Sequence, residues 1–216
     1  MQTIDKVRAA AICVLVILLA ATTACKNSRI KAREYDVLSA FINAKLAAPK
    51  GEESPNSTGD GIAKIAILNQ TESNEQRESF LMDGKGQPIP WTQTASSLQS
   101  QAPTLRQATL DAFREVNSQQ STFKRSFSLA VNYELANSTQ LGSVIRNGGW
   151  PAFYKRFPGS PGIVSFSRVG MSGDGTQALF YTSHVCGGLC GGGQFVVMER
   201  RDGRWFIEKE IDMWMS

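Results

Sequence analysis

The feature that most limits the possible fold is a series of short strand-like segments, separated by turns, in the last third of the chain. Residues 163–169, 177–183 and 195–200 are strand candidates rich in apolar residues, and residues 205–213 form a fourth in which apolar and charged residues alternate. Turn-forming residues separate these segments, and they lie at 172–175, at 186–193 and in the Asp202-Gly203 pair. Asp-Gly between two alternating segments is typical of a two-residue β-hairpin turn. The sequence therefore predicts an antiparallel β-meander over residues 162–216.

The last of these segments predicts a strand with one apolar and one charged face. Its odd-numbered residues are apolar except for Lys209, and the apolar ones should face the core: Trp205, Ile207, Ile211 and Met213. Its even-numbered residues should face water, and three of them are carboxylates: Glu208, Glu210 and Asp212. Paired carboxylates can perform acid–base catalysis, but on one face of a terminal strand they are more typical of a solvated negative surface.

The upstream sequence predicts helices that cover the apolar face of this sheet. Apolar residues recur at helical spacing in residues 29–48, 104–119, 138–147 and 150–157, with Gly148-Gly149 between the last two. Residues 62–69 and 127–135 predict strands, whereas residues 70–101 allow no assignment. A sheet must bury its apolar face against another layer. We therefore expect an α+β fold, in a single domain over residues 29–216, with the C-terminal antiparallel meander packed against the upstream helices.

The N-terminus has the pattern of an export signal. Lys6 and Arg8 precede a short apolar run at residues 9–21, and small residues then lead to Cys25. This order is typical of a signal peptide over residues 1–24, and the run is shorter than the roughly 20 residues of a membrane span. Three outcomes stay open: cleavage with lipidation of Cys25, cleavage to a soluble secreted protein, or an uncut segment that serves as an anchor.

The segment Thr22-Thr23-Ala24-Cys25 resembles the lipobox of bacterial lipoproteins. The resemblance implies lipidation of Cys25 and several acyl chains, which stable anchoring requires. Residues 25–28 would then form a lipidated tether. The expected location is the bacterial cell envelope, with the domain facing the periplasm or the exterior and the membrane as a partner through the lipid anchor.

The charge of the chain argues against nucleic acid as a partner. The formal net charge is +4, and loss of residues 1–24 would leave +3 because that segment carries Asp5, Lys6 and Arg8. No stretch combines dense basic residues with interleaved aromatics, the pattern typical of nucleic-acid binding. We therefore expect an unknown protein or a small ligand as the partner of the domain.

The strongest candidate for a chemically active site is a group of three residues near position 186. Cys13 lies in the signal segment and Cys25 directly follows it, so Cys186 and Cys190 remain for the folded domain, and His184, the single histidine, lies beside them. These three residues could ligate Zn²⁺ or copper, although no fourth ligand is evident. In an exported protein, two cysteines this close most often form a disulfide. We expect a Cys186–Cys190 disulfide that closes a glycine-rich loop, with no metal and no cofactor, and keep the metal site as the alternative.

Other candidate sites carry weaker signals. The glycines of residues 187–193 could present backbone N–H groups to an anion, but turn geometry explains them as well. A Ser-His-acid triad could use only His184, and the chain has no G-x-S-x-G motif. Arg168, beside Ser167, could bind an anion, although an exposed strand arginine is the simpler interpretation.

Residues 150–157 contain an aromatic stripe, Trp150, Phe153, Tyr154 and Phe157, at helical spacing. Such a stripe could line a ligand pocket but is more typical of core packing. Together with the Phe157-Pro158-Gly159-Ser160, Ser167-Arg168-Val169-Gly170, Cys186-Gly187-Gly188 and Asp202-Gly203 motifs and Trp205, it resembles an uncharacterised module of bacterial secreted proteins and lipoproteins. The resemblance covers residues 150–214 and implies fold and export, with no activity attached.

These observations favour a membrane-anchored lipoprotein that acts as a binding or assembly module, without catalytic residues. Two alternatives stay open. One is a hydrolase or metal-dependent enzyme that uses His184. The other is a small-ligand carrier, which requires a large apolar pocket between sheet and helix.

Overall fold

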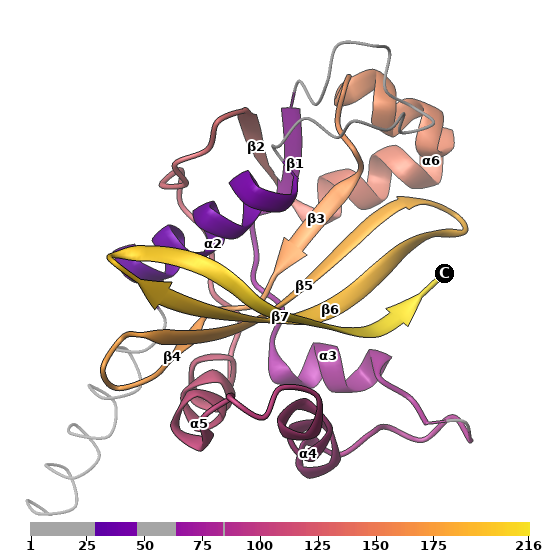
Figure 1. The fold of residues 1–216 in the computed structure, drawn as a ribbon. Coiled ribbons are helices and arrows are strands. Elements are labelled where there is room, and N and C mark those ends of the chain that lie inside the picture. The colour runs from indigo at the N-terminus through magenta and orange to yellow at the C-terminus, as the bar shows by residue number, and fades with distance from the viewer. Residues whose placement is uncertain (1–28, 47–63, 84) are drawn as a thin grey trace, which may run out of the picture.

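The computed structural model describes residues 29–46, 64–83 and 85–216. Figure 1 shows one twisted mixed sheet with helices around it, which confirms the α+β class. The strands run in the order β2-β1-β3-β5-β6-β7, and the short β4 also pairs with β5. The elements in chain order are α2 (Ala32–Lys45), β1 (Lys64–Leu68), α3 (Asn74–Phe80), α4 (Trp91–Gln101), α5 (Gln107–Val116), β2 (Asn132–Ala136), α6 (Ser138–Arg156), β3 (Ile163–Phe166), β4 (Gly170–Met171), β5 (Gln177–Gly187), β6 (Cys190–Arg201) and β7 (Arg204–Met215).

The predicted antiparallel meander is present in β5, β6 and β7. Antiparallel pairing joins β5 to β6 and β6 to β7. At the β6–β7 turn, Asp202 has φ 50° and Gly203 has φ 78°, the left-handed backbone that a tight hairpin turn requires. The first half of the sheet is different, because β1 pairs in parallel with both β2 and β3. Parallel neighbours need crossover connections, and α6 lies in the connection from β2 to β3.

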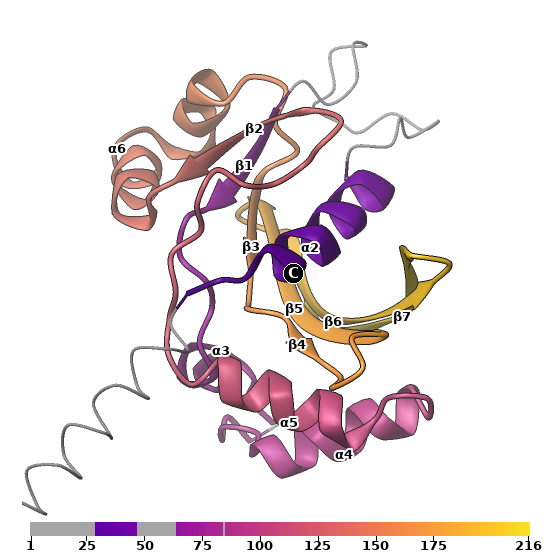
Figure 2. The same ribbon diagram turned by 90° about the vertical axis from the view of Figure 1, so that its left-hand side faces the viewer.

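Helices cover both faces of the sheet, not one. Along β5, Phe180 packs with α2 in one core, and its neighbour Tyr181 packs with α4 and α5 in a second core. A third core lies between β1 and α6. Figure 2 shows α2 on the concave side of the curved sheet, and α6 and the α3–α5 group on the other side. The expectation of one apolar sheet face is therefore wrong, because β5 and β6 carry apolar side chains on both faces.

The prediction for the faces of β7 is wrong in one respect. Trp205 and Ile207 pack in the core beside α2, whereas Ile211 and Met213 pack in the core on the opposite face. The register of β6 and β7 shifts between Val197 and Met198, where β7 has an extra residue. Such a bulge moves the side chains that follow it to the other face of the sheet. Odd-numbered residues therefore lie on one face before the bulge and on the opposite face after it.

The predicted glycine-rich loop is also wrong. Strand β5 continues to Gly187 and β6 begins at Cys190, so most of residues 186–193 belong to a long β-hairpin. The glycines of this stretch pair with β5 and with the end of β7. Cross-strand pairing here overrides the turn tendency that glycine shows in isolation.

The helical predictions hold with adjusted bounds. Residues 70–101, for which the sequence allows no assignment, contain α3 and α4. The strand predicted at 127–135 is shorter and lies later in the chain, as β2. The two helices predicted at 138–157 join as α6 across a kink at Gly149, whose φ is 65°. A glycine adopts this left-handed backbone without steric cost, which explains why the break falls there.

Candidate functional site

A hollow forms on the sheet face that carries α6 and the α3–α5 group. Ile163 of β3 packs in the core beside α6, and Tyr181 of β5 packs in the core beside α5. Between them, Ser165 of β3 lies opposite Ser183 of β5. Side chains two residues apart in a strand share a face, so all four point to the same side. The two small serines leave the middle of this face unfilled between the two cores.

We call this hollow the central pocket. Its volume is about 560 Å³, within the range typical of small-molecule sites. The sheet supplies the floor, and the segment that leads into α3 and α3 itself supply one wall. The lining residues are Leu68, Glu72, Gln76, Arg77, Ser165, Tyr181, Ser183, Val185 and Trp214.

Glu72 is the acidic group of the central pocket. Its backbone N–H donates to the carbonyl of Phe166 at 3.0 Å, which fixes its position beside β3. Its Oε1 atom accepts hydrogen bonds from the hydroxyls of Ser165 and Ser183, the latter at 2.9 Å. Within the described residues, Oε2 accepts no hydrogen bond, and it is not among the solvent-inaccessible atoms that lack a partner. Glu72 therefore presents one carboxylate oxygen that a ligand can reach.

Arg77 is the basic group of the same pocket, and it is buried to 1% exposure. Its Nη2 donates to Asn74 Oδ1 at 2.6 Å, whereas Nη1 has no hydrogen-bond partner among the described residues. Burial lowers the pKa of the guanidinium to about 10, against the opposing effect of the Glu72 carboxylate, so the group stays cationic at neutral pH. The guanidinium carbon lies 4.7 to 6.0 Å from the centroids of four rings, those of Trp91, Phe113, Tyr181 and Phe195. These ring faces stabilise the charge where no carboxylate contacts it.

Tyr181 and Trp214 form the aromatic part of the pocket wall. The Trp214 indole N–H donates to the Tyr181 hydroxyl at 2.7 Å. Burial is the main cause that raises the pKa of Tyr181 to about 12. A Cβ atom on Gly193 would overlap the Tyr181 hydroxyl and the Trp214 indole nitrogen. The glycine-rich sequence therefore has a structural role in the site, since Gly193 makes room for the contact between these two rings.

The structure brings Cys186 and Cys190 together, and it directs His184 to a backbone carbonyl. Their Sγ atoms lie at disulfide-bonding distance, and their Cα atoms are 5.1 Å apart. His184 directs Nε2 to the carbonyl oxygen of Pro161 at 2.9 Å. In the part of the chain that the structure describes, no three His, Cys, Asp or Glu side chains are arranged to hold a metal ion.

Arg168 is not an exposed strand residue, contrary to the simpler interpretation of the sequence. It is 2% exposed and forms an ion pair with Glu34 of α2, with Nη2 and Oε1 2.7 Å apart. Asn117 completes this buried cluster, because its Oδ1 accepts from the Arg168 backbone N–H at 2.8 Å. Arg168 therefore links α2 to the sheet and to the end of α5.

The other candidates are separated or absorbed into the core. Glu208 pairs with Arg201, and Glu210 pairs with Lys45 of α2 at 2.7 Å, so the three carboxylates of β7 do not act as one exposed row. In the aromatic stripe, Phe153 and Phe157 are buried in the core beside α6, and Trp150 and Tyr154 pack against it.

The sequence carries one local signal for the central pocket, at the start of α3. Ser73 and Gln76 have the spacing of a capping box, and both reciprocal hydrogen bonds form at the start of α3. This spacing predicts a helix that begins beside Glu72 and carries Arg77. The polar character of residues 70–101 concealed it.

The export signal, Cys25 and residues 26–28 lie outside the described residues. Among the residues that are described, no helix is both long and apolar enough to cross a bilayer. No protein-family model matches the chain, and no curated protein or solved structure is significantly similar to it.

Proposed function

We propose that this protein is an exported lipoprotein of the bacterial cell envelope, anchored through Cys25, whose domain binds a small ligand in the central pocket. The sequence of charged, apolar and small residues before Cys25 supports export and lipidation. The observation that carries the binding function is the pairing of a solvent-accessible Glu72 oxygen with an apolar wall in one pocket of about 560 Å³.

The lining favours a ligand with an apolar body and a head that donates hydrogen bonds. Leu68, Val185 and Trp214 offer apolar surface, and Glu72 offers an acceptor. A carboxylate head is disfavoured, because Glu72 would repel it and the unpaired Nη1 of Arg77 is out of reach of solvent. The ligand class is therefore an amine, amide or alcohol on a small apolar group.

The central pocket favours the carrier or binding alternative over the enzyme alternative. His184 follows Ser183 in β5, so its side chain points to the opposite sheet face, where it lines a smaller hollow of about 250 Å³. Its ring nitrogen is engaged with Pro161. We expect His184→Ala to leave ligand binding in the central pocket unchanged.

Nuclear magnetic resonance can test ligand binding at this pocket directly. The probe is 2-phenylethylamine, and the reporter is the Trp214 indole N–H, assigned by comparison with Trp214→Phe. We expect saturable shifts of this signal with the amine and none with 3-phenylpropionate, which has a carboxylate head. Glu72→Gln should weaken binding at least about tenfold, the effect of losing a charged hydrogen bond of roughly 1.5 kcal/mol.

Glu75→Gln is the matched control, because Glu75 is an exposed residue of α3, three positions after Glu72, and does not line the pocket. Equal weakening in Glu75→Gln and Glu72→Gln, or preferential binding of the carboxylate, would contradict the proposed site. The anchor has its own test, since mass spectrometry of the mature N-terminal peptide should show lipid mass on Cys25. An unmodified N-terminal Cys25 would contradict the anchor.

A further inference from the structure

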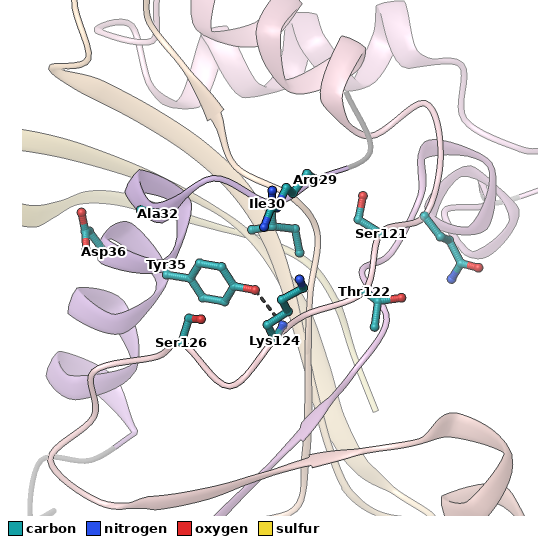
Figure 3. Close-up of a pocket in the computed structure, with 10 residues that line it drawn as sticks. Arg29, Ile30, Ala32, Tyr35, Asp36, Ser121, Thr122, Lys124 and Ser126 are labelled. Carbon is teal, nitrogen blue, oxygen red and sulfur yellow. Dashed lines mark hydrogen bonds between the residues drawn. The ribbon is translucent and has the colours of Figure 1, made fainter. Parts of the chain in front are cut away.

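A second hollow lies at the start of α2, beside Arg29, the first residue that the structure describes. We call it the α2 groove. Its volume is about 720 Å³, and residues from α2 and from the segment after α5 form its walls. Figure 3 shows the Lys124 side chain directed toward Arg29 and Ile30, with hydroxyl side chains beside it. The lining residues are Arg29, Ile30, Ala32, Tyr35, Asp36, Gln120, Ser121, Thr122, Lys124 and Ser126.

The shape of the groove depends on a contact between its two walls. The backbone N–H of Lys124 donates to the Tyr35 hydroxyl at 2.7 Å, as the dashed line in Figure 3 marks. Tyr35 also packs edge-on against Phe123 and Phe127. This contact holds the backbone of Lys124 beside α2. The Lys124 side chain therefore extends from a fixed position in the wall of the groove.

The charges of the groove and its rim are mainly positive. Residues 29–36 and 120–126 contain five cations, Arg29, Lys31, Arg33, Lys124 and Arg125, against Glu34 and Asp36. Glu34 is buried in its pair with Arg168, which leaves Asp36 as the exposed acid of these two segments. Across residues 29–46, 64–83 and 85–216, neither Arg29 nor Lys124 forms an ion pair through its side chain. An arginine, a lysine and neighbouring hydroxyls suit a phosphate group, which arginine can bind through two hydrogen bonds.

The length of chain before Arg29 restricts where such a phosphate comes from. Arg29 is the fourth residue after Cys25, so an extended tether between them spans at most about 14 Å. Each headgroup layer of a bilayer is on the order of 5–8 Å thick. With lipid on Cys25, the start of α2 must therefore stay close to the phosphates of the membrane surface.

We propose that the α2 groove binds the phosphate of an anionic phospholipid headgroup, and that the side chains of Arg29 and Lys124 donate the main hydrogen bonds to it. The membrane as the source of this phosphate rests on the lipid anchor proposed above. Binding there orients the domain, because it places the start of α2 against the membrane and leaves α6, on the opposite sheet face, away from it.

Vesicle co-sedimentation tests the proposal without the lipid anchor. The protein is the mature chain 25–216 with Cys25→Ser, which retains every described residue. It should bind vesicles that contain phosphatidylglycerol and should not bind pure phosphatidylcholine vesicles at the same ionic strength. Arg29→Gln with Lys124→Gln should weaken binding about 25-fold, since each basic residue near an anionic surface contributes about fivefold.

The matched control is Arg146→Gln with Lys155→Gln, which removes the same charge from exposed positions of α6. We expect this variant to bind as the unsubstituted chain does. Equal loss in both double variants would overturn the proposal, because it would show attraction by net charge alone. Binding of inorganic phosphate at the groove without binding to anionic vesicles would also overturn it, since a soluble phosphate would then be the ligand. The lipid on Cys25 is measured separately, so failure here is distinct from failure of the anchor.

Discussion

Two buried arginines in this protein have opposite surroundings. Arg168 meets Glu34 in an ion pair whose side chains are 2% and 4% exposed. Arg77 is buried to 1% exposure, yet it forms no ion pair among the described residues, and its Nη1 has no hydrogen-bond partner. A buried charge that is fully paired links the secondary-structure elements that carry the pair. Its removal leaves the partner charge buried and uncompensated. A buried charge without a partner costs stability, so its presence in a pocket wall indicates a role other than stability.

The largest expected effect comes from breaking the paired cluster. Arg168→Met keeps a long apolar side chain but leaves Glu34 charged and buried. We expect unfolding in urea to show a loss of about 3–5 kcal/mol, as found when one member of a buried pair is removed. A loss below about 1 kcal/mol would mean that water reaches Glu34 and that the comparison between the two arginines fails.

A substitution in the pocket wall should have the next largest effect. Gly193→Ala would force the Tyr181 and Trp214 rings apart, because the new Cβ overlaps both. We expect a cost of about 1–3 kcal/mol, typical of overpacking, together with a changed shift of the Trp214 indole N–H. Gly188→Ala is the control, since a Cβ there meets nothing within 4 Å.

The disulfide should contribute a smaller amount. The two cysteines are four residues apart, so the closed loop is short and the loop-closure relation gives at most about 2 kcal/mol. Cys186→Ser with Cys190→Ser, measured by urea unfolding beside the reduced unsubstituted protein, should reproduce this loss. A loss well above that value would show that the cysteines hold more of the fold than their own hairpin.

Removal of the unpaired arginine should have the smallest effect on stability. Arg77→Met removes one hydrogen bond and several ring contacts, but it also removes the cost of burying a charge. We expect the free energy of unfolding to change by less than about 1 kcal/mol, in contrast to the same substitution at Arg168. A loss of several kcal/mol in Arg77→Met would show that Arg77 stabilises the fold as Arg168 does, and it would contradict the difference between the two arginines.

The sequence predicted the parts of the fold that depend on local patterns. The Asp202-Gly203 turn, the helix that carries Phe41 and Ile42, and the aromatic stripe of Phe153 all appear where periodicity and turn chemistry placed them. These features depend on residues close together in the chain, which is the range over which such patterns are reliable.

The features that the sequence did not predict depend on distant contacts. The bulge near Met198 follows from pairing between β6 and β7 and reverses the faces of the second half of β7. The burial of Arg168 requires Glu34, 134 residues earlier in the chain. The central pocket unites Glu72, Ser183 and Trp214 from three separate regions, and no spacing rule connects them.

In this interpretation the Glu72 carboxylate serves ligand binding, whereas the ion pair of Arg168 with Glu34 serves stability. The most direct test is urea unfolding with and without 2-phenylethylamine, for the unsubstituted protein, Glu72→Gln and Arg168→Met. A ligand that binds the native state raises the free energy of unfolding, by about 2.7 kcal/mol at a concentration 100-fold above Kd. We expect this increase in the unsubstituted protein and in Arg168→Met, and its loss in Glu72→Gln. No increase in the unsubstituted protein, or an equal increase in Glu72→Gln, would contradict the account.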